Sequence, residues 1–317
     1  MGKLEVGPGL PWILVYNHLD VQPADESEWN TKPFEPVVNN KEIIARGATD
    51  DKGPMLATLY AIKYLHETKQ LPVNVEFIYE TYEENGSLGF DSLFGDTLRK
   101  GLLVKPDSIL VSDGVFLGEY PTIDVALRGL LKVKVSVQTA SKNIHSGLGG
   151  GVVRNPFHIL MAALSKCYDL QGTKIPYHAE ADVSMRLVGK QNPRSIFASL
   201  RTYLQQIYPS IKVDLASSTP AVNISPHNAF VQKAALACQY GYGEAPLYIN
   251  SGGTIGAFVA IQQQFPTVPI VSLNMSKASD GYHAPNEKFE WEQARRGMKT
   301  MVAYVKGIGG LRTTHKS

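Results

Sequence analysis

The chain of 317 residues is poor in cysteine, has no long apolar run and carries no block of one charge sign. Its two cysteines, Cys167 and Cys238, lie far apart, which excludes a disulfide framework and a thiolate zinc cluster and fits a reducing cytoplasm. No run approaches the roughly 18 apolar residues of a membrane span, and the N-terminus lacks a basic segment followed by an apolar core, so we expect neither membrane insertion nor export. The 31 basic and 29 acidic residues nearly cancel. We therefore expect small or neutral partners rather than nucleic acid.

The first part of the chain alternates short apolar runs with helical periods. Strands are predicted at 12–18, 73–80 and 108–113, and helices near 54–69 and 88–99. Short buried strands separated by helices of this length are typical of a mostly parallel sheet with helices on both faces. The predicted fold class is therefore α/β.

The pattern changes after residue 121. "LLKVKVSVQT" and "EADVSMRLV" alternate apolar and polar residues with period two, which indicates half-exposed antiparallel strands, and helices are predicted near 155–168 and 194–207. From residue 223 the α/β pattern returns. We predict a larger domain formed by 1–121 and 223–317, with a smaller α+β domain, 122–222, inserted into it.

The stretch "LVYNHLD" places two polar side chains at the end of the first apolar strand. His18 and Asp20 are two residues apart, so they share one face at the carboxyl end of that strand. Open α/β sheets bind ligands at this edge. In isolation, an exposed polar strand end is the commoner explanation, so only partners elsewhere in the chain favour a site.

Further ligand-type side chains follow at the ends of other predicted elements. They are Asp50 and Asp51 in "RGATDDKGP", Glu83 and Glu84 in "YEENGS", Asp113 in "SDG", and His283 in "HAPNE". Taken singly, each fits a helix cap, a turn or an exposed loop. Taken with His18, they give the two histidines and several carboxylates of a two-metal hydrolytic site.

The motifs resemble, in order and approximate spacing, the M20 family of zinc metallopeptidases, and within it the carnosinase-like dipeptidase branch. "NHLDVQP", "RGATDDKGP", "YEENGS", "SDG", "LRG", "NIHSGLGGGVVRNP" and "HAPNE" carry the resemblance, which runs from about residue 12 to 305. It implies that 1–121 with 223–317 is a catalytic di-zinc domain and that 122–222 is a lid and dimerisation domain.

The resemblance also implies a metal-ligand set. His18 and Asp113 would hold one Zn²⁺, Glu84 and His283 the other, and Asp50 would bridge both, with Mn²⁺ or Co²⁺ as substitutes. A carboxylate between two Zn²⁺ ions about 3.5–4 Å apart leaves room for a water whose pKa falls towards neutrality.

Two further carboxylates receive roles beside these ligands. Glu83, adjacent to the ligand Glu84, fits the general base that takes a proton from water and passes it to the leaving amine. Asp20 would bond the far ring nitrogen of His18 and fix its tautomer.

His145 lies in the inserted domain. As a lone histidine it fits an ordinary surface residue, but "HSGLGGG" matches the family motif whose histidine reaches a neighbouring subunit's active site and stabilises the oxyanion. The resemblance therefore implies a homodimer.

Substrate contacts are predicted at two places. Arg186, in "SMRLV", matches a position where the family binds a substrate carboxylate, although an outward-facing strand arginine fits equally. Ser251, Gly252, Gly253 and Thr254 open a predicted helix whose free N–H groups suit an anion, and a plain tight turn also fits.

The chain departs from the family pattern in three places. The helical segment that usually precedes the first catalytic strand is nearly absent, and "LQGT" replaces a long stretch of the inserted domain, so we expect a compact variant or a fragment. Asn17 stands where glycine is common, which we expect to affect backbone freedom rather than chemistry.

The predicted function is a cytoplasmic di-zinc hydrolase that cleaves the amide bond of a dipeptide or a similar small substrate with a free carboxylate. An N-acyl amino acid deacylase on the same scaffold is the alternative; in the family, aspartate at position 113 accompanies dipeptidases and glutamate accompanies deacylases. A non-catalytic binding or assembly subunit is the alternative from another class. A complete ligand set with its base favours an enzyme.

Overall fold

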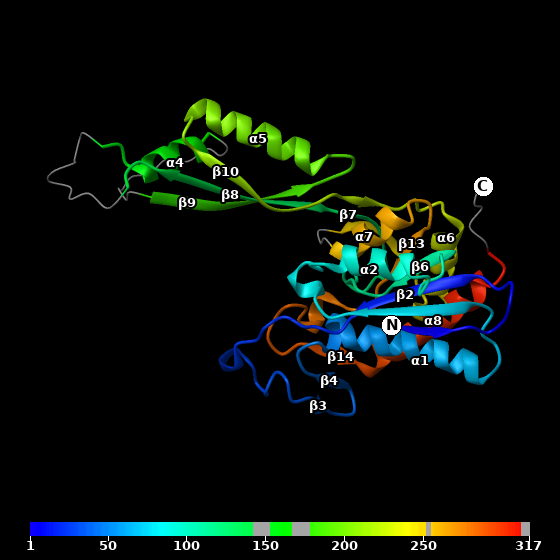
Figure 1. Cartoon of the computed structure of the whole chain (residues 1–317). Helices are drawn as coiled ribbons and strands as arrows, with labels where there is room; N and C mark the ends of the chain where they lie inside the picture. The colour runs from blue at the N-terminus through cyan, green and yellow to red at the C-terminus, as the bar shows by residue number, and fades with distance from the viewer. Residues whose placement is uncertain (142–152, 167–177, 252–254, 312–317) are drawn as a thin grey trace. The chain divides into compact units, whose positions relative to one another are not determined.

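The computed structural model describes residues 1–141, 153–166, 178–251 and 255–311 (Figure 1). The chain forms two compact units. The larger unit combines Met1–Leu127 with Asn223–Ser317, and the smaller unit is Arg128–Val222.

The larger unit is built on an eight-stranded mixed sheet (Figure 1). Its order is β1-β5-β2-β6-β13-β7-β11, with β12 also paired to β7. The strands are β1 (Gly2–Leu4), β2 (Trp12–His18), β5 (Asn74–Glu80), β6 (Ser108–Val111), β7 (Thr122–Leu127), β11 (Val222–Asn223), β12 (Leu247–Ser251) and β13 (Ile270–Leu273). β2 runs parallel to β5 and β6, and β6 runs parallel to β13. The predicted mostly parallel α/β fold is thereby confirmed.

Helices cover both faces of this sheet. They are α1 (Gly53–Glu67), α2 (Phe90–Arg99), α6 (Ala229–Tyr242), α7 (Gly256–Gln264) and α8 (Trp291–Ile308). On one face α8 packs against both α1 and α6, and on the other α2 packs against α7 (Figure 1). The β2 residues from Ile13 to Tyr16 are at most 1% exposed because helices lie above and below them. Among the described residues, no helix is long and apolar enough to cross a membrane.

Short elements connect the sheet to the loops that carry the predicted site. Four short helical turns are η1 (Glu26–Glu28), η2 (Ala48–Lys52), η3 (Glu83–Asn85) and η4 (Ala278–Asp280). A three-stranded sheet has the order β14-β4-β3, from Lys288–Glu290, Glu42–Ile44 and Val37–Val38. Two of the turns, η2 and η3, contain predicted site residues.

The smaller unit is an antiparallel three-stranded sheet of order β10-β8-β9 with two helices. The strands are β8 (Gly129–Gln138), β9 (His178–Leu187) and β10 (Lys212–Thr219), and the helices are α4 (Pro156–Leu164) and α5 (Pro193–Ile207). Along β8, Leu131 and Val133 are buried and Lys132 and Lys134 are exposed, as period-two alternation predicts. The segment Thr122–Leu127, assigned to the inserted domain from the sequence, forms β7 in the larger sheet, where it pairs with β12 and β13.

Candidate metal centre

The predicted ligands follow the carboxyl ends of neighbouring parallel strands. His18 is the last residue of β2. Glu83 and Glu84 follow the end of β5 in η3, and Asp113 follows the end of β6. Because β5, β2 and β6 are adjacent and parallel, their carboxyl ends meet at one edge of the sheet.

The structure brings the five predicted ligands together in two groups that share Asp50. The first ligand group is His18, Asp50 and Asp113, and the second is Asp50, Glu84 and His283. Within each group the donor atoms lie within 4.8 Å of one another.

The two Asp50 oxygens serve different groups. Its Oδ1 lies 3.0 Å from His18 Nε2, and its Oδ2 lies 2.8 Å from His283 Nε2. In the first group Asp113 Oδ2 lies 3.8 Å from His18 Nε2. In the second, Glu84 Oε2 lies 3.3 Å from His283 Nε2. Asp50 therefore has the geometry of a carboxylate shared between two cations.

A buried glutamate from the "HAPNE" motif holds the loop that carries Asp50. The Glu287 carboxylate accepts hydrogen bonds from the backbone N–H groups of Gly47, Thr49 and Asp50 at 2.8–3.0 Å. The same carboxylate accepts a 2.9 Å hydrogen bond from Arg46 Nη1. Glu287 is fully buried, so losing these bonds would leave several buried polar groups unsatisfied. Sequence reasoning assigned no role to this residue, although its position in the motif was a signal.

His18 is oriented through its other ring nitrogen. Its Nδ1 lies 3.0 Å from the backbone oxygen of Asp20 and 3.4 Å from the Asp20 carboxylate. A proton on Nδ1 leaves the Nε2 lone pair free to face the first ligand group. Asp20 Oδ2 accepts a 3.0 Å hydrogen bond from the backbone N–H of Glu84. Asp20 therefore contacts one member of each ligand group. Its backbone oxygen lies closer to His18 than its carboxylate does.

Asn17 has a larger role than its position in the sequence indicated. Its Nδ2 donates to Asp51 Oδ2 at 2.7 Å and to Ser112 Oγ at 2.8 Å. Asp51 Oδ2 also accepts a 3.3 Å hydrogen bond from the backbone N–H of His18. A glycine at position 17 could make neither side-chain bond. An amide directly after the apolar run "ILVY" was the signal that could have identified it.

The electrostatics of the cluster favour positive charge. Burial disfavours a charged His18, but the hydrogen bond to Asp50 and the nearby Asp113 and Asp51 carboxylates outweigh it and raise the pKa of His18 to about 11. Hydrogen bonds to Asp50 and Glu84 raise the pKa of His283 to about 10. Burial opposes ionisation of Asp50, yet its hydrogen bonds with both histidines lower its pKa to about 2.

Two carboxylates beside them, Glu83 and Asp113, resist ionisation. Burial, followed by the nearby Asp113 charge, raises the pKa of Glu83 to about 8. Burial, together with the Asp50 charge, raises the pKa of Asp113 to about 6. Several neighbouring carboxylates thus repel one another, and only two imidazolium groups compensate their negative charge. Divalent cations would relieve this repulsion. The donor set of imidazoles and carboxylates fits Zn²⁺ or a similar ion.

Of the other residues predicted to bind substrate or to act in catalysis, only Arg186 and Ser251 lie among the described residues. Arg186 lies on β9 of the smaller unit, opposite Leu130 of β8, and its side chain is exposed. Ser251 is the last residue of β12. His145, Gly252, Gly253 and Thr254 lie outside the described residues. Their predicted roles stay predictions.

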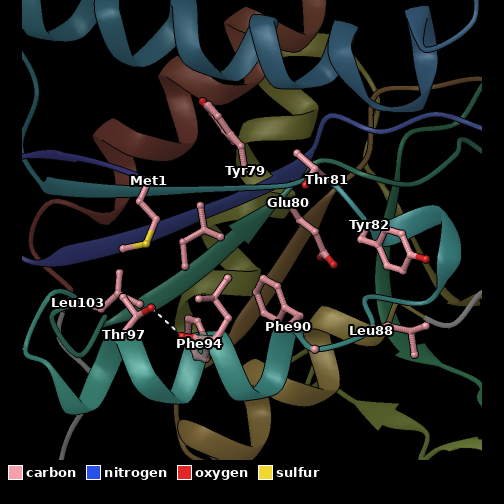
Figure 2. A pocket seen from close by; sticks show the side chains of 13 residues that line it. Met1, Tyr79, Glu80, Thr81, Tyr82, Leu88, Phe90, Phe94, Thr97 and Leu103 are labelled. Carbon is pink, nitrogen blue, oxygen red and sulfur yellow. Dashed lines mark hydrogen bonds between the residues drawn. The ribbon is translucent and has the colours of Figure 1, made fainter.

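A pocket of about 400 Å³ lies between β5 and α2 (Figure 2). Figure 2 shows Tyr79 and Glu80 pointing to opposite sides of β5, with Glu80 directed towards Phe90 of α2. The Glu80 carboxylate accepts a 2.5 Å hydrogen bond from the Tyr16 hydroxyl. None of the five clustered ligands lines this mainly apolar pocket. The Glu80 carboxylate thus joins β5 to β2 through Tyr16.

The fold and the shared-carboxylate cluster define a two-metal hydrolase. Residues 14–307 match the model of peptidase family M20/M25/M40, and the chain belongs to this family of metallopeptidases. The resemblance drawn from the sequence motifs is confirmed.

Curated relatives span most of the chain. The Cys-Gly metallodipeptidase DUG1 of Candida albicans is 34% identical over 394 residues, covering 98% of this chain and 81% of the relative. The Cys-Gly metallodipeptidase dug1 of Schizosaccharomyces pombe is 26% identical, covering 98% and 83%.

Solved structures share the fold. The M20 family metallo-carboxypeptidase Sso-CP2 of Sulfolobus solfataricus has a TM-score of 0.84 at 25% identity, covering 98% of this chain and 87% of that structure. Human carnosine dipeptidase 1 has a TM-score of 0.79 at 23% identity, covering 98% and 82%. The second likeness, at this identity, concerns the fold alone.

Proposed function

We propose that the chain hydrolyses the amide bond of dipeptides or similar small substrates with a free carboxylate, using two Zn²⁺ ions per chain. The observation that carries the proposal is the pair of ligand groups sharing Asp50. The proposal assigns catalysis to the larger unit and a lid or dimerisation role to the smaller one.

Each side chain in the cluster has a separable task. His18 and Asp113 would hold one ion, Glu84 and His283 the other, and Asp50 would contact both. When bound, the ions would supply Lewis acidity that polarises the scissile carbonyl and lowers the pKa of a water molecule.

Glu83 is the proposed general base. Its pKa of about 8 reflects burial and neighbouring carboxylates, and nearby divalent cations would lower it towards neutrality. A carboxylate in this range accepts a proton from water and returns it to the leaving amine. Its neighbour Glu84 instead has its Oε2 held by a 2.6 Å hydrogen bond from Gln22 Nε2 and faces His283. Adjacent residues thus have different environments that suit different roles.

The dipeptide preference is supported by the relatives. Besides the Cys-Gly dipeptidases, the Beta-Ala-His dipeptidase of Rattus norvegicus is 35% identical over 54% of this chain. An N-acyl amino acid deacylase would use the same cluster on a different substrate.

The test is zinc stoichiometry followed by a substrate panel. Chelator-treated protein is reloaded with Zn²⁺, or with Mn²⁺ or Co²⁺, and assayed on Cys-Gly, β-Ala-His and N-acetyl amino acids. We expect two ions per chain and hydrolysis of the dipeptides. His18→Ala and His283→Ala should each lose metal, whereas His227→Ala, at an exposed histidine outside the cluster, should not.

Other outcomes separate the alternatives. Turnover of N-acetyl amino acids alone would favour the deacylase. Two bound ions without turnover would favour a binding subunit, and absence of metal in wild-type protein would contradict the proposal.

A homodimer in which His145 acts across subunits is also part of the proposal. Mixing inactive Glu83→Gln chains with inactive His145→Ala chains should restore some activity, because one intact site can form from two chains. No recovery in verified mixed dimers would contradict action across subunits.

A further inference from the structure

Tyr282 contacts both ligand groups although it belongs to neither. Its hydroxyl donates a 2.9 Å hydrogen bond to Asp113 Oδ1 in the first group. Its ring stacks on His283 of the second group, with centroids 4.8 Å apart and planes inclined by 20°. One side chain therefore contacts a member of each group.

The hydroxyl contact fixes how Asp113 presents its oxygens. Asp113 is buried, and its Oδ2 lies 3.8 Å from His18 Nε2 while Oδ1 accepts the Tyr282 bond. Without the hydroxyl, the carboxylate can rotate about its terminal bond, because carboxylate torsions are broad. The bond thus keeps Oδ2 towards the first ligand group.

The ring contact restricts the side chain of His283, which is otherwise exposed to solvent. The His18 side chain is fully buried and held at Nδ1, whereas the His283 side chain is 47% exposed. An exposed imidazole loses more rotational freedom when it binds an ion, unless packing already restricts it. Stacking on Tyr282 supplies that restriction while Nε2 faces Asp50 and Glu84.

We propose that Tyr282 is a positioning residue for both metal subsites, acting through its hydroxyl on Asp113 and through its ring on His283. The inference rests on the proposed two-metal function. The two contacts can be separated by substitution, because phenylalanine at position 282 keeps the ring and removes only the hydroxyl.

Zinc affinities of Tyr282→Phe and Tyr282→Leu test the inference. Chelator-treated protein is titrated with Zn²⁺ by calorimetry, and both binding steps are fitted. Tyr282→Phe should weaken one step by about 10–100-fold and leave the other unchanged, as is typical when a ligand's supporting hydrogen bond is removed. Tyr282→Leu should weaken both steps. Tyr242→Phe, which removes the hydroxyl of a buried tyrosine on α6, should weaken neither.

The metal-free melting temperature of each variant separates positioning from folding. If Tyr282→Leu does not fold, Tyr282→Phe still decides the matter through its single affected step. Affinities within about two-fold of wild type in both Tyr282 variants, or equal weakening of both steps by Tyr282→Phe, overturn the inference while the two-metal function stands. Wild-type protein that binds no Zn²⁺ overturns both.

Discussion

The two units of the chain use their sheets in different ways. In the larger unit, parallel strands buried on both faces end at a common edge where histidines and carboxylates gather. In the smaller unit, the antiparallel strand β8 alternates buried and exposed residues, and its buried side chains form a core with α4 and α5. Among the described residues, both candidate metal groups belong to the larger unit.

The difference shows where each sheet can bring polar side chains together into a site. Strands buried on both faces leave their ends as the places where polar side chains can converge. A sheet covered on one face devotes alternate residues to packing and alternate residues to solvent. Substitutions at the strand ends of the larger unit should therefore change metal binding. Substitutions in the core of the smaller unit should change stability.

The largest expected effect is loss of both metal ions in Asp50→Asn. Asp50 supplies a different oxygen to each ligand group, and a neutral amide is a poor substitute for a shared carboxylate. Zinc content and dipeptide hydrolysis should both fall to background. Asp214→Asn, at an exposed position of β10, is the matched control and should change neither. An Asp50→Asn variant that retains both ions would contradict the assignment of Asp50 as the shared ligand.

The next effect is a rate loss without metal loss in Glu83→Gln. The amide keeps the size of the side chain but cannot accept the proton, so turnover should fall by about 10²–10⁴-fold. Glu84→Gln should instead lower zinc content. Both quantities are measured side by side by metal analysis and dipeptide hydrolysis. If Glu83→Gln loses zinc while Glu84→Gln keeps it and remains active, the two roles are reversed.

A core substitution in the smaller unit should change stability and spare the metals. Leu131 is fully buried among Val133, Val135 and the helices of its unit, so Leu131→Ala should cost about 2–5 kcal/mol of unfolding free energy. The exposed neighbour Lys132→Ala should stay within about 0.5 kcal/mol. Denaturant unfolding measures both changes. Loss of zinc in folded Leu131→Ala protein would show that the metal centre depends on the smaller unit's core.

A further expected effect is a pH dependence of the stability of the metal-free protein. Histidines whose folded pKa values are raised, His18 to about 11 and His283 to about 10, stabilise the fold fully below their ordinary value of 6.5. That stabilisation is lost as pH rises through the raised values. Glu83 and Asp113, raised to about 8 and about 6, act in the same direction.

The melting temperature of chelated protein should therefore fall between about pH 6 and pH 9. Zn²⁺ should reduce this dependence, because bound cations replace the imidazolium protons. A melting temperature that rises over this range without metal would contradict the electrostatic account. Asp214→Asn, in the smaller unit, should keep the wild-type dependence.

Local patterns in the sequence were enough to predict much of the fold. The apolar run at 12–18 gave a buried parallel strand, and the alternation in "LLKVKVSVQT" gave a half-exposed antiparallel one. Both follow from side-chain period and burial, which are local properties. The assignment of Thr122–Leu127 differed, because membership of a sheet depends on its partners β12 and β13, which lie far along the chain.

The order of residue types along the chain is enough to identify the chemistry that is present: two histidines and several carboxylates in ordered motifs, each at the end of a predicted element. How these groups are supported depends on the folded structure. Glu287 accepts a hydrogen bond from the Asp50 backbone, Asn17 donates to Asp51, and Tyr282 donates to Asp113 and stacks on His283. Such contacts join residues up to 237 positions apart. Side-chain type is fixed residue by residue, whereas a hydrogen-bond partner is fixed by where the folded backbone places it.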